Sequence, residues 1–171
     1  MSRFALFGTL ALAAVVHLGA QPRAHKAHEH GHAKLNIAFE TTTGTPVGAV
    51  ELESPADSIL GFEHAAKTPA DKAKQEKALA TLKARFGEMV ILPAGCKMTP
   101  AKVEVHVEGQ HAEVHAEFNA KCAGPIAGKT ISFGFAKVFP KIEEVEVQML
   151  AGTQQAKLEV EKDKGTLQIA K

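Results

Sequence analysis

The chain has no tryptophan and no tyrosine among its 171 residues, and it has only two cysteines. Tryptophan and tyrosine most often anchor protein interfaces, so their absence weakens the case for a large aromatic binding surface. An excess of one charge is also missing, because 20 lysines and arginines accompany 19 aspartates and glutamates. Nucleic acids and anionic membranes favour basic partners, so we expect the chain to bind neither.

The first 20 residues differ in composition from the rest. Arg3 precedes an almost unbroken apolar run from Phe4 to Val16, and small residues follow up to Ala20. This order is typical of a secretory signal peptide, and the run falls short of the ~20 apolar residues of a membrane span. We predict that residues 1–20 are a cleaved signal peptide, with cleavage after Ala24 or Ala27 as alternatives. No later stretch predicts stable membrane insertion.

The remaining chain is long enough for one domain with a core. Residues 21–33 are basic and histidine-rich without an apolar period, so we expect a mobile segment there. From residue 34 onward, apolar and polar residues alternate in several stretches, which is typical of half-buried strands. The pattern predicts a single β-rich domain over residues 34–171, of the α+β class, with a mainly antiparallel sheet or sandwich. A last hairpin is expected across Asp163–Gly165.

One amphipathic helix is well marked. Thr68 can cap it, Pro69 suits its first position, and Asp71 lies in its first turn. Apolar residues from Ala73 to Phe86 recur near helical spacing. Gly87 can end the helix.

Cys96 and Cys122 most simply form one disulfide, because an exported protein folds in an oxidising compartment. Such a bridge stabilises by about 3–4 kcal/mol in the chain-entropy model. The alternative, a Cys-His metal site, needs free thiols and is disfavoured by export.

Alternating residues between the cysteines predict a hairpin that turns within Glu108–Gln110. A three-residue turn would put His106 opposite Ala112 and break the pattern described next. Two registers with a two-residue turn remain open, because a turn at Glu108-Gly109 pairs His106 with His111, and one at Gly109-Gln110 pairs His106 with Glu113. In both registers one face carries the same imidazoles and carboxylates, namely Glu104, His106, His111, Glu113 and His115. The cysteines would then staple the base of the hairpin. Zn²⁺ accepts such nitrogen and oxygen ligands, although a half-buried strand also has a polar face without any metal.

A second histidine cluster precedes the first predicted strand and comprises His25, His28, His30 and His32. The last three have a period of two, opposite in phase to the apolar positions that follow, so they should face away from the core. Short histidine tracts bind Zn²⁺, Cu²⁺ or Ni²⁺. A disordered lead-in with incidental histidines is the alternative.

Glu63 and His64 form a third and weaker candidate, since adjacent side chains on a strand point to opposite faces. The sequence shows no nucleophile-base arrangement, phosphate-binding glycine loop or metalloprotease helix. We therefore expect no enzyme activity.

Taken in order, these segments resemble the ZrgA family, bacterial zinc-uptake proteins of the periplasm. The similar segments, after the signal peptide, are His28–Ala33, Leu35–Ile37, Leu52–Ala56, Gly61–Ala65, Thr68-Pro69, Ala94–Cys96, Cys122, Phe139–Glu143 and Val145–Met149. Many relatives carry a long insertion rich in histidine, aspartate and glutamate between the cysteines. Here only three histidines remain there, so we expect one or two sites rather than high-capacity storage.

The resemblance implies periplasmic zinc binding through histidines and delivery towards a zinc import system. The candidate ligands are His28, His30, His32, Glu63, His64, His106, His111, Glu113 and His115. Imidazoles release metal as they gain protons, so occupancy should fall below about pH 6. The alternatives are a periplasmic copper- or nickel-binding protein and a non-catalytic envelope interaction protein.

Overall fold

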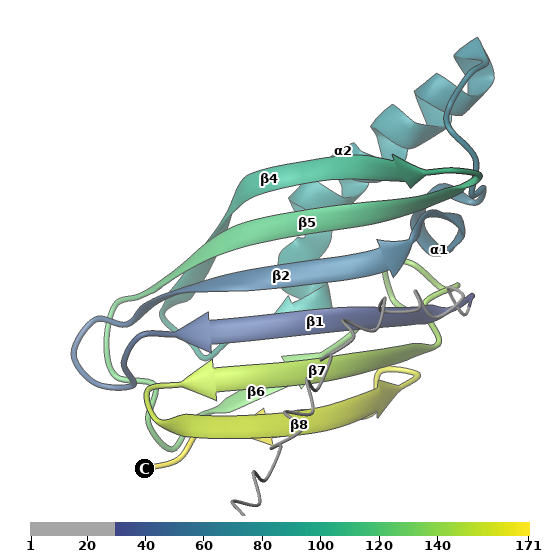
Figure 1. Ribbon diagram of the computed structural model, residues 1–171. Coiled ribbons are helices and arrows are strands. Elements are labelled where there is room, and N and C mark those ends of the chain that lie inside the picture. The colour runs from purple at the N-terminus through teal and green to yellow at the C-terminus, as the bar shows by residue number, and fades with distance from the viewer. Residues whose placement is uncertain (1–29) are drawn as a thin grey trace, which may run out of the picture.

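The computed structural model describes residues 30–171, so the predicted signal peptide and most of the histidine-rich segment lie outside the described residues. A six-stranded sheet with the order β4-β5-β2-β1-β7-β8 faces the viewer in Figure 1, and a three-stranded sheet has the order β3-β6-β9. The elements are β1 (His32–Phe39), β2 (Val47–Pro55), α1 (Ala56–Leu60), α2 (Pro69–Met89), β3 (Val90–Ile91), β4 (Cys96–Glu108), β5 (His111–Cys122), β6 (Thr130–Phe133), β7 (Glu144–Ala151), β8 (Gln154–Glu161) and β9 (Thr166–Gln168).

The core lies between the large sheet and the elements behind it, which are α2 and the small sheet (Figure 1). Strand alternation sends Leu35 and Ile37 into the core, where both are almost fully buried. Phe86 of α2 stacks on Phe118 of β5 with ring centroids 3.8 Å apart. One face of the large sheet is therefore covered, and the other, called the outer face below, is open to solvent.

The predicted α+β class is confirmed. Thr68 caps α2 as expected: the Asp71 amide donates to Thr68 Oγ1 at 3.1 Å, and the Thr68 amide donates to Asp71 Oδ2 at 3.2 Å. The helix nevertheless continues past Gly87 to Met89, because burial of Phe86 and Met89 outweighs the weak helix propensity of glycine. Ala73, assigned to its apolar stripe, is exposed.

Three details of the predicted strands need correction. The first strand begins at His32 rather than Lys34, and it pairs with β7 in parallel, so the sheet is mixed. The last hairpin is wrong: β8 pairs with β7, whereas β9 pairs with β6 in the other sheet. Asp163 lies at positive φ and accepts the Ala136 amide at 2.8 Å, and this turn directs the chain across to the small sheet. The short helix α1 was not predicted.

The hairpin of β4 and β5 takes one of the two registers considered, with the turn at Gly109-Gln110 and His106 opposite Glu113. Cys96 lies opposite Cys122, and the two form a disulfide at the base of the hairpin. An irregularity between Pro100 and Lys102 shifts the register by one residue. Because of this shift, Cys96 can lie opposite Cys122 while His106 lies opposite Glu113. Within the described residues, no helix combines the length and apolar character needed to cross a membrane.

Candidate metal-binding site

All the imidazoles of the described residues except that of His64 gather at one end of the outer face, where the hairpin turns and β1 begins. Register explains this, because Glu53 of β2 lies opposite His115 of β5, and His115 lies opposite Glu104 of β4. The next row joins His106, Glu113 and Pro55. We call this region the histidine end, defined by His30, His32, Glu63, Glu104, His106, His111, Glu113 and His115.

The hairpin contributes the first group of side chains, which the sequence predicted to share a face. His115 Nε2 lies 3.2 Å from Glu113 Oε2, and both side chains are about one-third exposed. The rings of His106 and His115 tilt towards each other with centroids 5.4 Å apart. We call Glu104, His106, Glu113 and His115 the hairpin group.

His30 reaches the same end because the chain turns sharply before β1. Gly31 has φ +82°, a conformation that glycine adopts without strain. Its amide bonds to the buried Ser58 hydroxyl at 3.3 Å, and its carbonyl oxygen accepts the Glu143 amide at 2.8 Å. An added Cβ there would lie 3.3 Å from Glu143 Cγ and from the Lys141 carbonyl oxygen. The turn therefore has both a conformational and a steric need for glycine.

Glu63 arrives from the segment that follows α1. Gly61 ends α1 with φ +81° and donates its amide to the Asp57 carbonyl oxygen at 3.0 Å. This left-handed cap reverses the chain after the helix. The Glu63 carboxylate, 26% exposed, then lies between two imidazoles: Oε1 is 3.2 Å from His30 Nδ1, and Oε2 is 3.7 Å from His111 Nδ1.

Asp57 extends this second group, and the sequence did not single it out. Its Oδ2 atom lies 3.7 Å from His30 Nδ1, and Lys141 Nζ contacts both of its carboxylate oxygens at 3.0 and 3.1 Å. We call His30, Asp57, Glu63 and His111 the Glu63 group. The only sequence signal for Asp57 was its place at the end of a strand. The prediction placed His111 with the other hairpin histidines, whereas in the structure its Nδ1 atom lies 3.7 Å from Glu63 Oε2.

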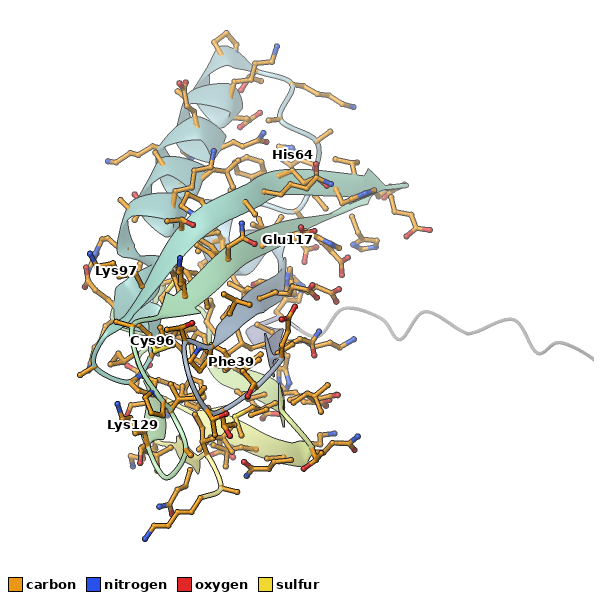
Figure 2. The ribbon with its side chains drawn as sticks, turned by 90° about the vertical axis from the view of Figure 1, so that its left-hand side faces the viewer. Phe39, His64, Cys96, Lys97, Glu117 and Lys129 are labelled. Atoms are coloured by element: carbon orange, nitrogen blue, oxygen red, sulfur yellow. A yellow bond between two sulfur atoms is a disulfide. The ribbon has the colours of Figure 1, made fainter. Side chains whose placement is uncertain are left out.

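The remaining candidate ligands lie apart from these two groups. His32 is on the outer face, 3.4 Å from Glu144 of β7. His64 has local contacts, because its ring stacks on Phe62 at 4.9 Å and its Nδ1 atom lies 3.0 Å from the Ala65 carbonyl oxygen. Figure 2 shows it well separated from Cys96 and Lys97. His28 lies outside the described residues.

Carboxylates surround the histidine end with negative charge. Lys102 hydrogen-bonds Glu104, and this bond, with the charges of Lys102, His106 and His115, keeps the pKa of Glu104 below its usual value. Glutamates outnumber lysines across the same rows on β1, β2, β7 and β8, where Lys34 accompanies Glu53, Glu144, Glu146, Glu159 and Glu161. Such a surface favours the approach of a cation.

The nitrogen-oxygen distances of 3.2–3.7 Å in the two groups are close to those around a tetrahedral ion, since ligand atoms about 2.0–2.2 Å from zinc lie about 3.3–3.6 Å from one another. Among residues 30–171, however, no set of three or more histidine, cysteine, aspartate or glutamate side chains already surrounds a common metal position. Coordination would therefore need rotamer changes. Exposed side chains such as His30, 65% exposed, make these changes within nanoseconds.

Comparison with known proteins and with protein families shows which family the chain belongs to. A search of curated proteins found none that matches the chain. A family model described as ZrgA family zinc uptake protein matches residues 27–169, which includes every residue of both groups. The match extends over most of the 171 residues and agrees with the resemblance found in the sequence. The chain therefore belongs to the ZrgA family of zinc uptake proteins.

Proposed function

We propose that the protein captures Zn²⁺ in the periplasm at the histidine end and supports zinc uptake without catalysing a reaction. The observation that carries the proposal is the position of Glu63, whose carboxylate lies between His30 and His111. These three side chains come from the start of β1, the segment after α1 and the hairpin. Residues so far apart in the chain meet here because of the fold.

In this proposal the Glu63 group binds one ion through His30, Glu63 and His111. Asp57, whose carboxylate Lys141 holds 3.7 Å from the same His30 Nδ1 atom that faces Glu63, adds negative charge beside the ion. The hairpin group can bind a second ion through His106, Glu113 and His115. His28, His32 and His64 remain predicted ligands that could collect the ion or complete its coordination.

Copper and nickel are the chemical competitors, because Cu²⁺ binds a given nitrogen and oxygen site more tightly than Zn²⁺ does. The family description favours zinc. Capture would be followed by delivery of the ion to a zinc import system. The other alternative, an envelope interaction protein without a metal, would bind its partner equally well in the presence of a chelator.

A competition titration tests the proposal on the full mature chain. Chelator-buffered Zn²⁺, Cu²⁺ and Ni²⁺ at physiological free concentrations are offered together, and native mass spectrometry reports which metal binds and in what number. We expect one or two zinc ions per chain. Substituting Glu63→Gln should lower zinc affinity about tenfold, since the amide keeps the shape but loses the charge.

Glu51→Gln is the matched control, because Glu51 is an exposed glutamate of β2 on the same face that contacts neither group. The zinc affinity of the Glu51→Gln variant should equal that of the unchanged chain. Preferential loading with copper or nickel, or equal zinc affinity in the Glu63→Gln and Glu51→Gln variants, would contradict the proposal.

A further inference from the structure

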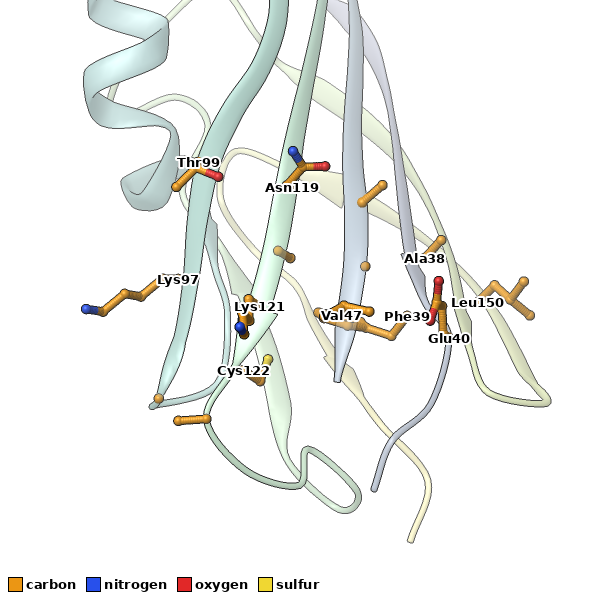
Figure 3. A pocket seen from close by; sticks show the side chains of 15 residues that line it. Ala38, Phe39, Glu40, Val47, Lys97, Thr99, Asn119, Lys121, Cys122 and Leu150 are labelled. Carbon is orange, nitrogen blue, oxygen red and sulfur yellow. The ribbon is translucent and has the colours of Figure 1, made fainter. Parts of the chain in front are cut away.

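A hollow of about 1030 Å³ lies on the outer face, at the opposite end from the histidines. Figure 3 shows Ala38 on β1 at its floor and Leu150 of β7 on one side. The floor is recessed because its side chains are small: Ala49 of β2 lies directly opposite Ala38. We call this region the lysine hollow, defined by Ala38, Val47, Ala49, Lys97, Lys121 and Leu150.

Register shows that two rows of the sheet form this surface. One row runs from Thr99 and Asn119 to Ala49, Ala38 and Leu150. The other joins Lys97, Lys121 and Val47. Val47 and Leu150 are 40% and 44% exposed, which is unusual for apolar side chains of this size within the described residues. The surface is therefore apolar in its centre and basic along the hairpin side, with Glu40 beside Val47 on the side away from the hairpin (Figure 3).

The two lysines make an unfavourable pair within the protein. Lys97 lies directly opposite Lys121 across the hairpin, and like charges in that arrangement destabilise a sheet. Two other sheet lysines have carboxylate partners, since Lys102 pairs with Glu104 and Lys157 with Glu146. In the part of the chain that the structure describes, no ion pair involves Lys97 or Lys121. An external anion would relieve this repulsion.

From this surface we propose that the lysine hollow docks an amphipathic helix of a partner protein, whose apolar stripe is flanked by carboxylates. Small floor residues let a helix approach closely, and Val47 and Leu150 meet its apolar stripe. Lys97 and Lys121 pair with the carboxylates along one flank. The inference does not depend on metal binding at the other end.

The geometry favours a helix over other occupants. The floor strands β5, β2 and β1 already pair on both sides, so no backbone groups remain there for an added strand. The hollow extends from β4 to β7, roughly 19 Å at ~4.8 Å per strand, which accommodates a helix about 10–12 Å wide. A small molecule on this open face would keep much of its surface in water, unlike a ligand in an enclosed pocket.

Two designed peptides of about 18 residues provide the probes. Both carry leucines at helical spacing, and they differ only in having glutamates or lysines on the flanks. Fluorescence anisotropy with the full mature chain should show the glutamate peptide binding about tenfold more tightly than the lysine peptide. The difference should shrink at high salt.

The decisive variant is Lys97→Glu/Lys121→Glu, which keeps a like-charged pair across the hairpin and changes only its sign. It should reverse the peptide preference. The matched control, Lys72→Glu/Lys83→Glu on the exposed surface of α2, should keep the original preference. Ala49→Phe, which fills the floor, should weaken both peptides while circular dichroism shows an unchanged fold.

Three results would overturn the inference. The first is equal binding of both peptides, or no binding of either. The second is a dimer of the chain alone that Lys97→Glu/Lys121→Glu dissociates, because a second copy would then be the occupant. The third is tighter binding of decanoate than of the glutamate peptide at the same residues, which would assign the surface to a small amphiphile.

Discussion

The histidine end and the lysine hollow belong to the same outer face and are built on the same central strands, yet their chemistry is opposite. β5 carries His111, Glu113 and His115 near the turn, whereas Asn119 and Lys121 follow towards the disulfide. β2 changes likewise, from Glu53 at one end to Ala49 and Val47 at the other. Alternation alone keeps all these side chains on one face. One sheet thus presents imidazoles and carboxylates at one end and two facing lysines at the other.

The two ends also differ in how they are held. At the hollow, a covalent bridge between Cys96 and Cys122 ties the hairpin together. At the histidine end, the Gly31 turn, the α1 cap and side-chain pairs bring separate segments together. We therefore expect that substitutions at one end change the properties of that end and leave those of the other end unaltered.

Removing the disulfide should have the largest effect and should act on stability alone. The pair Cys96→Ser/Cys122→Ser is expected to lower the free energy of unfolding by about 2–4 kcal/mol, because the unfolded chain regains entropy. Urea denaturation followed by circular dichroism measures this loss. Zinc affinity below the unfolding transition should stay within about twofold, since additivity holds for distant sites. A parallel loss of zinc affinity would show that the two ends are not independent.

Removing the hairpin imidazoles should act in the opposite way. His106→Ala/His111→Ala/His115→Ala is expected to lower zinc affinity by about 100-fold, because it takes ligands from both groups. Competition with a chromogenic chelator measures the change. The control Lys97→Glu/Lys121→Glu, also on the hairpin, should keep the affinity of the unchanged chain. An unaltered affinity in the triple variant would exclude the hairpin from zinc binding.

Acidification should release metal before it weakens the capping of α2. Imidazoles bind zinc only without their proton, so a two-imidazole site loses roughly 100-fold in affinity between about pH 7.5 and 5.5. The Thr68 hydroxyl and amide hold the pKa of Asp71 below its usual value. A lowered carboxyl pKa contributes stability that is complete above about pH 4 and is lost as pH falls through the folded value. Zinc titrations and helix content measured across this range should therefore show two separate transitions.

How far the sequence predicted these ends differs from one feature to another. The hairpin face could be predicted because alternation in β4 and β5 is local, and the turn left only two registers. The α2 cap was likewise written in adjacent residues, Thr68 to Asp71. The approach of Glu63 to His30 and His111 could not be predicted, because it depends on the direction of the chain after α1.

The lysine hollow was missed for a similar reason. Lys97 and Lys121 lie next to the predicted cysteine pair, but the floor beside them could not be predicted, because Ala38 and Leu150 come from β1 and β7, which pair in parallel although they are far apart in sequence. Pairing of β1 with β7 is a long-range choice that periodicity does not specify. The pairing of β9 with β6 rather than with β8 is also long-range. It depends on the turn at Asp163, which is held by the amide of Ala136, a residue distant in sequence.

The central claim concerns where the metal binds, and anomalous X-ray diffraction at the zinc absorption edge tests it most directly. Crystals of the mature chain grown with one equivalent of Zn²⁺ should show a peak about 2.0–2.2 Å from His30, Glu63 and His111. A second equivalent should add a peak at the hairpin group. The Glu63→Gln variant should weaken the first peak. A first peak elsewhere, with Glu63 remote from the ion, would contradict the account.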